Sequence, residues 1–228
     1  MRYRLAIFDF DGTLADSLPW VLRAMDDVAD RFKFRRVREG ELDELRHCDA
    51  GEVMRRLGIP RWKLPMIARY VRTRMAADVD QIQLFPGAGE VLDELVAAGL
   101  ALAVVSANGE ETIRKVLGPR ARHVTAMAAG VSLFGKRGKL LRMSRLAGIA
   151  PSDTIVIGDE IRDLNASKAA HMAFGAVSWG LTRPDALQAG GAETVFRHMA
   201  DIPRMLLAGQ APVLETLSAK APPAHLEP

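Results

Sequence analysis

The stretch RLAIFDFDGTLADS, residues 4–17, joins an apolar run to two aspartates separated by one residue. The run has the composition of a buried β-strand, and Asp9 and Asp11 follow where it ends. A single aspartate before a glycine is typical of a turn. Side chains at positions i and i+2 of a strand point the same way, so this pair is expected to converge in one crevice. Two carboxylates repel each other there unless a cation compensates, and Mg²⁺ prefers carboxylate, water and phosphate oxygens.

Short apolar runs alternate with amphipathic segments along most of the chain. Besides residues 3–10, the strand-like runs cover 100–107, 123–129, 154–159 and 173–179, and the expected helices cover 87–99, 109–118, 138–148 and 161–172. This alternation predicts an α/β fold, a three-layer, doubly wound parallel sheet with helices on both faces. Ligands bind beyond the carboxyl ends of such strands, where the strand order switches. Three runs end in polar residues expected at that edge: Asp9 with Asp11, Ser106, and Asp159.

Residues 18–82 interrupt the alternation, because they contain several helical stretches and no clear strand-like run. We therefore expect a helical domain inserted after the first strand. The sheet-bearing core would comprise residues 1–17 and 83–208. The remaining residues, 209–228, are rich in alanine and proline and are expected to form a loosely ordered tail.

A second acidic cluster ends another apolar run, in the stretch IVIGDEIRD. It contains Asp159, Glu160 and Asp163. Acidic residues at the start of a helix commonly do no more than favour the helix dipole. Because this cluster is expected at the same sheet edge as Asp9 and Asp11, it is a candidate completion of a metal site.

These motifs together resemble those of the haloacid dehalogenase superfamily in its phosphatase form. DFDGTLADS resembles the first motif, Asp-x-Asp-Gly-Thr-Leu, and LAVVSAN resembles the second, an apolar strand that ends here in Ser106. SLFGKRGKL offers the lysine of the third motif, and VIGDEIRD resembles the fourth, Gly-Asp-x-x-x-Asp, at Asp159 and Asp163. The helical insertion resembles the cap of the subgroup that includes phosphoglycolate phosphatases and β-phosphoglucomutases.

The resemblance implies a Mg²⁺-dependent phosphatase that acts on a small phosphorylated metabolite through an aspartyl phosphate. Asp9 would be the nucleophile, and Asp11 would act first as general acid and then as general base. Mg²⁺ would be bound by Asp9, the backbone carbonyl of Asp11, and Asp159. Asp163 would orient the lysine or metal-bound water, and Glu160 is a further supporting candidate.

The resemblance also assigns residues to the phosphate. Ser106 would donate a hydrogen bond to a phosphoryl oxygen, and Thr13 and Asn108 would help to bind the substrate. A lysine would neutralise the phosphate charge. Many relatives carry Lys-Pro at this point, whereas this chain has GKRGK. Lys136 is favoured over Lys139, because Lys136 is expected in the loop before a helix and Lys139 already inside that helix.

The stretch LRHCDAGE lies where a cap loop of this type can face the active site. Arg46 and His47 are therefore candidates for substrate selection, with Cys48 beside them. A lone cysteine is usually a packing residue, so structural roles for this loop stay open.

Composition limits the other function classes. Lysines and arginines number 31 against 28 acidic residues, and the two signs are interleaved, so no nucleic-acid-binding patch is expected. The single cysteine favours a reducing compartment, and the longest apolar stretch is too short to span a bilayer. A cytoplasmic protein is expected, monomeric or homodimeric.

Two alternatives to a phosphatase remain open. A phosphosugar mutase of the β-phosphoglucomutase type would share the same core residues. A non-catalytic interaction protein that keeps the fold would be expected to lose Asp9 or Asp11, and both are present. A dehalogenase is disfavoured, since its chemistry has no use for Asp11.

Overall fold

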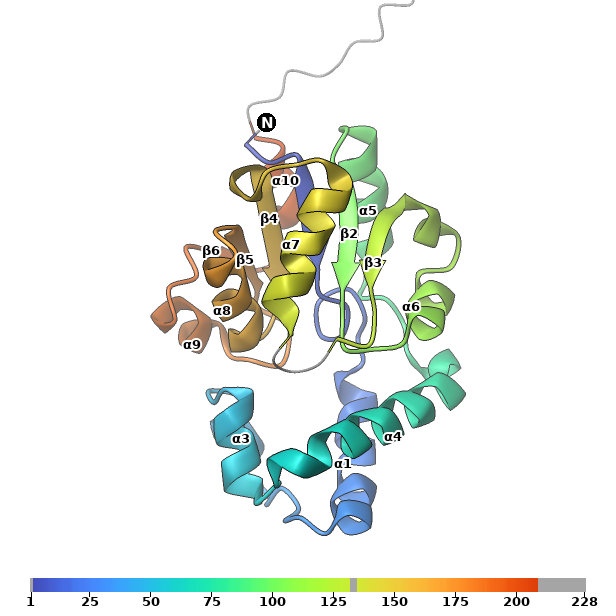
Figure 1. Ribbon diagram of the computed structural model, residues 1–228, viewed down its shortest axis with the longest axis vertical. Helices are drawn as coiled ribbons and strands as arrows, with labels where there is room; N and C mark the ends of the chain where they lie inside the picture. The colour runs from blue at the N-terminus through green and yellow to red at the C-terminus, as the bar shows by residue number, and fades with distance from the viewer. Residues whose placement is uncertain (1, 132–134, 209–228) are drawn as a thin grey trace, which may run out of the picture.

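The computed structural model describes residues 2–131 and 135–208. Figure 1 shows a sheet flanked by helices on both faces, with a separate group of helices beyond the carboxyl ends of the strands. The strands are β1 (Leu5–Phe8), β2 (Ala101–Val105), β3 (Val124–Ala128), β4 (Thr154–Gly158), β5 (Ala173–Val177) and β6 (Thr194–Phe196). They are arranged β3-β2-β1-β4-β5-β6, and all neighbouring strands are parallel. The predicted doubly wound α/β fold is confirmed.

The helices of the sheet-bearing part are α5 (Ala88–Ala97), α6 (Glu110–Leu117), α7 (Lys136–Ala147), α8 (Ile161–Ala169), α9 (Pro184–Ala189) and α10 (Asp201–Leu206). This part also contains the short 3₁₀ segments η3 (Gly118–His123) and η4 (Pro151–Asp153), and residues 18–82 contain η1 (Arg61–Lys63) and η2 (Val79–Gln81). Two kinds of prediction differ from the structure. The short strand β6 and the helices α9 and α10 were not expected from the sequence. Lys136 begins α7, so it does not lie in a loop before that helix. Gly138, which was expected to begin this helix, lies inside its first turn.

Each face of the sheet carries its own apolar core, because successive side chains of a strand point to opposite faces. Leu5 and Ile7 pack with buried residues of α7, α8 and α9. Ala6 and Phe8 pack on the other face, with buried residues of α5, α6 and α10. All four side chains of β1 are fully buried, which explains why the strand reads as a continuous apolar run.

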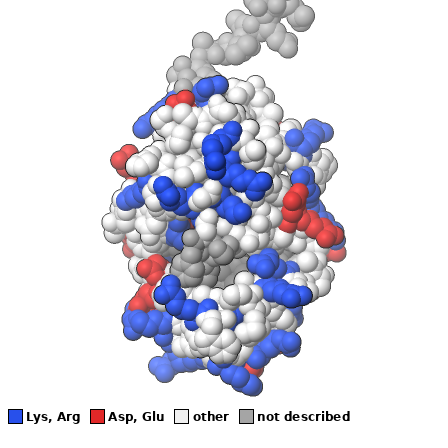
Figure 2. All heavy atoms as spheres, in the orientation of Figure 1, with Lys and Arg blue, Asp and Glu red and all other residues white. Residues whose placement is uncertain are grey.

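The helices between β1 and α5 lie beyond the carboxyl ends of the strands (Figure 1). They are α1 (Leu18–Phe32), α2 (Leu42–Leu45), α3 (Ala50–Leu57) and α4 (Leu64–Ala77). We propose that residues 18–82 form a cap, the name used for them below. Figure 2 shows acidic and basic side chains on both the cap and the sheet-bearing part, as the interleaved charges predict.

The two chain segments that join the cap to the core run side by side. Ala15 and Leu84 form an antiparallel bridge. The Asp16 amide donates to the Gln83 carbonyl at 2.8 Å, close to that bridge. We propose these paired segments as the hinge of the cap.

Within the described ranges, no helix combines the length and apolar character needed to cross a membrane. The tail predicted for residues 209–228 lies outside the described residues, as does the stretch 132–134.

Candidate active site

The ends of three central strands bring the predicted polar residues together. Strand β1 lies between β2 and β4, so the residues that follow these strands meet at one edge, where the chain order of the strands switches. Asp9, Ser106 and Asp159 occupy this edge and are each at most 2% exposed. This placement agrees with the prediction made from the three apolar runs.

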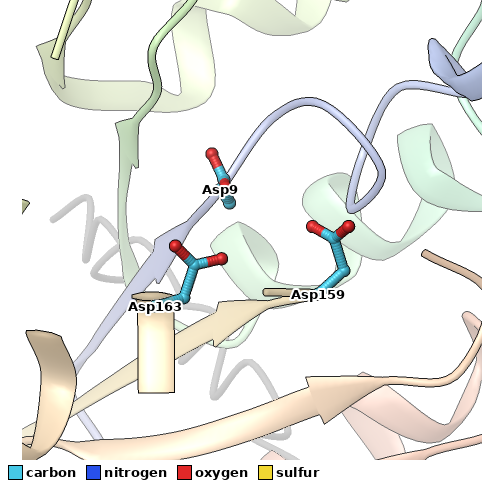
Figure 3. Close-up of side chains that lie close together, drawn as sticks. All are labelled: Asp9, Asp159 and Asp163. Carbon is cyan, nitrogen blue, oxygen red and sulfur yellow. The ribbon is translucent and has the colours of Figure 1, made fainter. Parts of the chain in front are cut away.

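Three carboxylates converge at this edge. One oxygen from each of Asp9, Asp159 and Asp163 lies within 4.8 Å of the others. In Figure 3, Asp9 follows β1, Asp159 follows β4, and Asp163 projects from α8 toward the same space. All three side chains are buried. Like charges gathered out of water are unfavourable unless cations or protons compensate them.

Lys136 supplies one of the compensating cations. Its Nζ lies 2.8 Å from Asp9 Oδ2 and 2.6 Å from Asp163 Oδ1. Burial by itself would raise the pKa of Asp9, but the charges of Lys136 and Arg162 outweigh it and hold that pKa below its ordinary value. Burial has the larger effect on Asp163 and raises its pKa to about 7 despite the same two cations. Asp9 is therefore the member of the cluster whose ionised form the surrounding cations favour.

Asp159 is held from both sides by hydrogen-bond donors. Thr13 Oγ1 donates to its Oδ1 at 2.9 Å, and the Leu181 amide donates to its Oδ2 at 2.8 Å. Burial, and then the nearby charges of Glu160 and Asp9, raise the pKa of Asp159 well above its ordinary value. A carboxylate that is fixed in place yet short of positive charge fits a divalent cation, and the donor set is entirely oxygen.

Asp11 occupies a different environment from Asp9. Its carboxylate accepts hydrogen bonds from Ser106 Oγ at 3.4 Å and from Asn108 Nδ2 at 3.2 Å. Burial, followed by the negative charge of Asp9, raises the pKa of Asp11 to about 6. The Asn108 amide also lies 2.8 Å from Met75 Sδ on the cap helix α4. The Asp11 carboxylate thus lies at the contact between core and cap.

Glu160 and Arg162 complete the surroundings of the acidic cluster. Glu160 caps α8 and exchanges side-chain-to-backbone contacts with Asp163 in a capping box. Arg162 Nη2 lies 2.7 Å from Glu160 Oε1 and 4.0 Å from Asp9 Oδ2. Sequence reasoning missed Arg162, because an arginine between two motif acids carries no periodicity or spacing signal of its own.

Arg46 and His47 lie on the cap, where their side chains contact the loop that follows β5 and the start of α9. Arg46 Nε donates to the Leu181 carbonyl at 2.8 Å, and its Nη2 donates to the Gly180 carbonyl at 3.0 Å. His47 Nε2 lies 3.5 Å from Asp185 Oδ2. Among the residues the structure describes, the hydrogen bonds and ion pairs of these two side chains do not reach Asp9 or Asp11. Direct substrate contact by either residue stays a prediction.

Comparison with known proteins identifies the family. The model of the haloacid dehalogenase-like hydrolase family matches residues 6–177, which include both acidic clusters and Ser106. The chain belongs to this family. The predicted resemblance and the prediction of a hydrolase are therefore confirmed.

The hydrolase matches curated relatives over most of its own length. The phosphoglycolate phosphatase of Synechococcus elongatus is 28% identical over 198 residues, which are 86% of this chain and 93% of that protein. The tyrosine-protein kinase PtkA of Mycobacterium tuberculosis is 29% identical over 209 residues, which are 87% of this chain and 70% of the kinase. A crystal structure from Lactobacillus plantarum has a TM-score of 0.76 at 23% identity, covering 90% of this chain and 100% of the other. That structural likeness shows the fold.

Proposed function

We propose that the protein is a Mg²⁺-dependent phosphatase that hydrolyses a small phosphate monoester through an aspartyl phosphate on Asp9. The contrast between its first two acids carries this proposal. Asp9 is buried against Lys136 at 2.8 Å, whereas Asp11 faces Ser106 and Asn108. The pKa of Asp9 is lowered and that of Asp11 is raised to about 6. Opposite shifts in neighbouring acids are typical of a nucleophile paired with a proton carrier.

The reaction then takes two displacements. In the first, an ionised Asp9 oxygen attacks phosphorus, the bond between phosphorus and the ester oxygen breaks, and Asp11 gives its proton to the leaving oxygen. In the second, Asp11 takes a proton from water as the water oxygen attacks phosphorus. The bond to Asp9 breaks, which releases inorganic phosphate and restores the free carboxylate. Lys136 and Ser106 offer a positive charge and a hydroxyl donor to the phosphoryl oxygens.

Asp9 and Asp159 would hold Mg²⁺ together with the backbone carbonyl of Asp11. Bound there, the ion supplies positive charge that offsets the charge of the transferring phosphoryl group. Thr13 and the Leu181 amide keep the Asp159 carboxylate in place for this task. Asp163 Oδ1 forms an ion pair with Lys136 Nζ at 2.6 Å, which supports its expected role of orienting the lysine.

The position of the cap favours a small substrate. Residues 18–82 lie over the carboxyl ends of the strands, where closure would exclude bulk water from the reacting phosphate (Figure 1). The relative from Synechococcus elongatus makes phosphoglycolate the first substrate to test. Arg46 and His47 remain candidates for selecting it.

A screen of phosphorylated metabolites, with Mg²⁺ or with EDTA, tests the proposal. We expect phosphate release that requires Mg²⁺ and that Asp9→Asn abolishes, while the circular dichroism spectrum stays unchanged. Asp26→Asn is the matched control, because Asp26 is an exposed aspartate on α1 of the cap. Full activity of Asp9→Asn would contradict the mechanism.

Two other outcomes have distinct signatures. A mutase would isomerise a phosphosugar with little release of phosphate from p-nitrophenyl phosphate. Because one relative is a tyrosine-protein kinase, the screen includes a further experiment. In it, the protein is incubated with ATP and then tested for phosphotyrosine. Tyrosine phosphorylation without hydrolysis of any monoester would favour that activity over the proposed one.

A further inference from the structure

The backbone after β5 lies directly against Asp159. We refer to residues 179–182 as the strap. The Leu181 amide donates to Asp159 Oδ2 at 2.8 Å, and the Thr182 amide donates to the Asp159 carbonyl at 3.2 Å. A Cβ on Gly180 would lie 2.1 Å from Asp159 Cβ, so only glycine permits this approach. The strap thus positions the acid that we propose as a metal ligand.

The strap also supports the second oxygen of Asp159. Trp179 Nε1 donates to the Thr13 carbonyl at 3.1 Å, and Thr13 Oγ1 donates to Asp159 Oδ1 at 2.9 Å. Trp179 in addition packs edge-to-face on Phe85, next to the proposed hinge, with ring centroids 6.2 Å apart. A change in the strap therefore affects both donors that hold this carboxylate.

Arg46 reaches the strap from the cap. Its Nη2 donates to the Gly180 carbonyl and its Nε to the Leu181 carbonyl, at 3.0 and 2.8 Å. The Gly180 carbonyl and the Leu181 amide belong to one peptide group. That group accepts from Arg46 on one side and donates to Asp159 on the other. Hydrogen bonds in such a chain polarise and orient one another.

Other contacts join α2 to the core without touching a partner of Asp159. Arg183 Nη1 lies 3.1 Å from Asp43 Oδ1, and the Arg183 amide donates to the Arg46 carbonyl at 3.0 Å. His47 pairs with Asp185 at 3.5 Å. These contacts also hold residues 42–47 of the cap against the core. Removing one of them therefore weakens docking without removing the Arg46 side chain.

We propose that Arg46 is a positioning residue that couples docking of the cap to the orientation of Asp159 through the Gly180–Leu181 peptide. The inference rests on the proposed function, in which Asp159 binds Mg²⁺. Docking of the cap then strengthens Mg²⁺ binding, and by thermodynamic reciprocity Mg²⁺ strengthens docking by the same factor. Loss of a residue that orients a metal ligand typically weakens metal binding by about 10–100-fold.

The test compares Arg46→Ala with Asp43→Asn, which removes a docking ion pair but leaves the strap untouched. Mg²⁺ affinity is measured by calorimetry without substrate, so the readout does not depend on turnover. We expect the dissociation constant to rise about tenfold or more in Arg46→Ala and less than twofold in Asp43→Asn. Arg46→Lys, which keeps the charge but loses the two-pronged donor geometry, should fall between them and serves if the alanine variant fails to fold.

A second readout follows the cap. In the wild-type protein, Mg²⁺ should slow amide hydrogen exchange across residues 42–47, and this protection should disappear in Arg46→Ala. Unchanged Mg²⁺ affinity in Arg46→Ala would overturn the coupling, and equal weakening in Asp43→Asn would overturn the role of the Arg46 side chain in it. Either result leaves the phosphatase proposal intact. Failure of the wild-type protein to bind Mg²⁺ would instead overturn the proposed metal requirement, and the coupling with it.

Discussion

Lys136 Nζ lies 2.8 Å from Asp9 Oδ2, and both side chains are almost completely buried. The contact joins the first turn of α7 to the end of β1, elements far apart in the sequence. An ion pair removed from water holds its partners in one geometry, and the loss of either partner leaves the other charge uncompensated.

We therefore expect Lys136→Met to abolish phosphate release and to lower the free energy of unfolding by about 3–5 kcal/mol, since Asp9 and Asp163 would both lose the nearer of their two cations. Activity on p-nitrophenyl phosphate and urea unfolding measure the two effects. Lys139→Met is the matched control, three residues along the same helix. Lys139 forms no ion pair within residues 2–131 and 135–208, so its loss should change neither quantity appreciably. A larger effect at Lys139 would reverse the assignment of the lysine.

Asp11→Asn should discriminate between leaving groups. An alkyl oxygen needs a proton as it departs, whereas p-nitrophenolate leaves readily without one. We expect the rate on an alkyl phosphate to fall by about 10²–10⁴-fold and the first displacement on p-nitrophenyl phosphate to fall much less. Burst kinetics on the two substrates measure the difference. Equal losses on both would show that Asp11 does not act as the acid.

The sequence predicted the acidic residues at the strand ends well. It predicted less well the charged residues on helices that pair with them. Asp9 and Asp159 directly follow apolar runs, so a local pattern was enough to place them at one sheet edge. Lys136 was expected in the loop before a helix over residues 138–148, but α7 begins two residues earlier and includes it. The periodic pattern of a helix locates its ends less precisely than its middle.

Contacts between distant segments had no local signal. Arg162 meets Asp9 only because α8 follows β4 beside β1, and no spacing in the sequence encodes that approach. Likewise, the partners of Arg46 depend on where the cap docks. Residue type and motif spacing therefore predicted which side chains meet at the carboxyl ends of the strands, while the fold determines which charges lie beside them.

Mg²⁺ should stabilise the protein more at high pH than at low pH. Burial first, and neighbouring acids next, raise the pKa of Asp159, and burial raises that of Asp163 to about 7 from an ordinary value of 3.8. In the metal-free protein, the folded state thus binds more protons than the unfolded state across this window. Its stability falls as the pH rises from about 4 through 7. In the proposed site Mg²⁺ would bind the deprotonated form of Asp159, so its contribution to stability would grow over the same range.

Melting temperatures in Mg²⁺ and in EDTA, taken near pH 5.5 and near pH 8, check this expectation. The difference between the two solutions should be larger near pH 8. Asp159→Asn should remove the difference at both values, because it removes a proposed ligand. If Mg²⁺ raised the melting temperature of the wild-type protein equally at both pH values, protons and the metal would not compete for the site.

Glycine is required at position 12 both by the backbone conformation and by the lack of room for a Cβ atom. Its φ is +74°, and a Cβ there would lie 2.3 Å from Asp159 Oδ2. Gly12→Ala should therefore cost about 1–2 kcal/mol for the left-handed backbone and, in addition, push the Asp159 carboxylate out of place. Gly40→Ala separates the two effects, since Gly40 has a φ of +77° with nothing within 4 Å of its Cβ position. Both variants should lose stability in urea, but only Gly12→Ala should lose Mg²⁺ binding in calorimetry. Retention of wild-type Mg²⁺ affinity by Gly12→Ala would mean that the position of Asp159 does not govern the metal site.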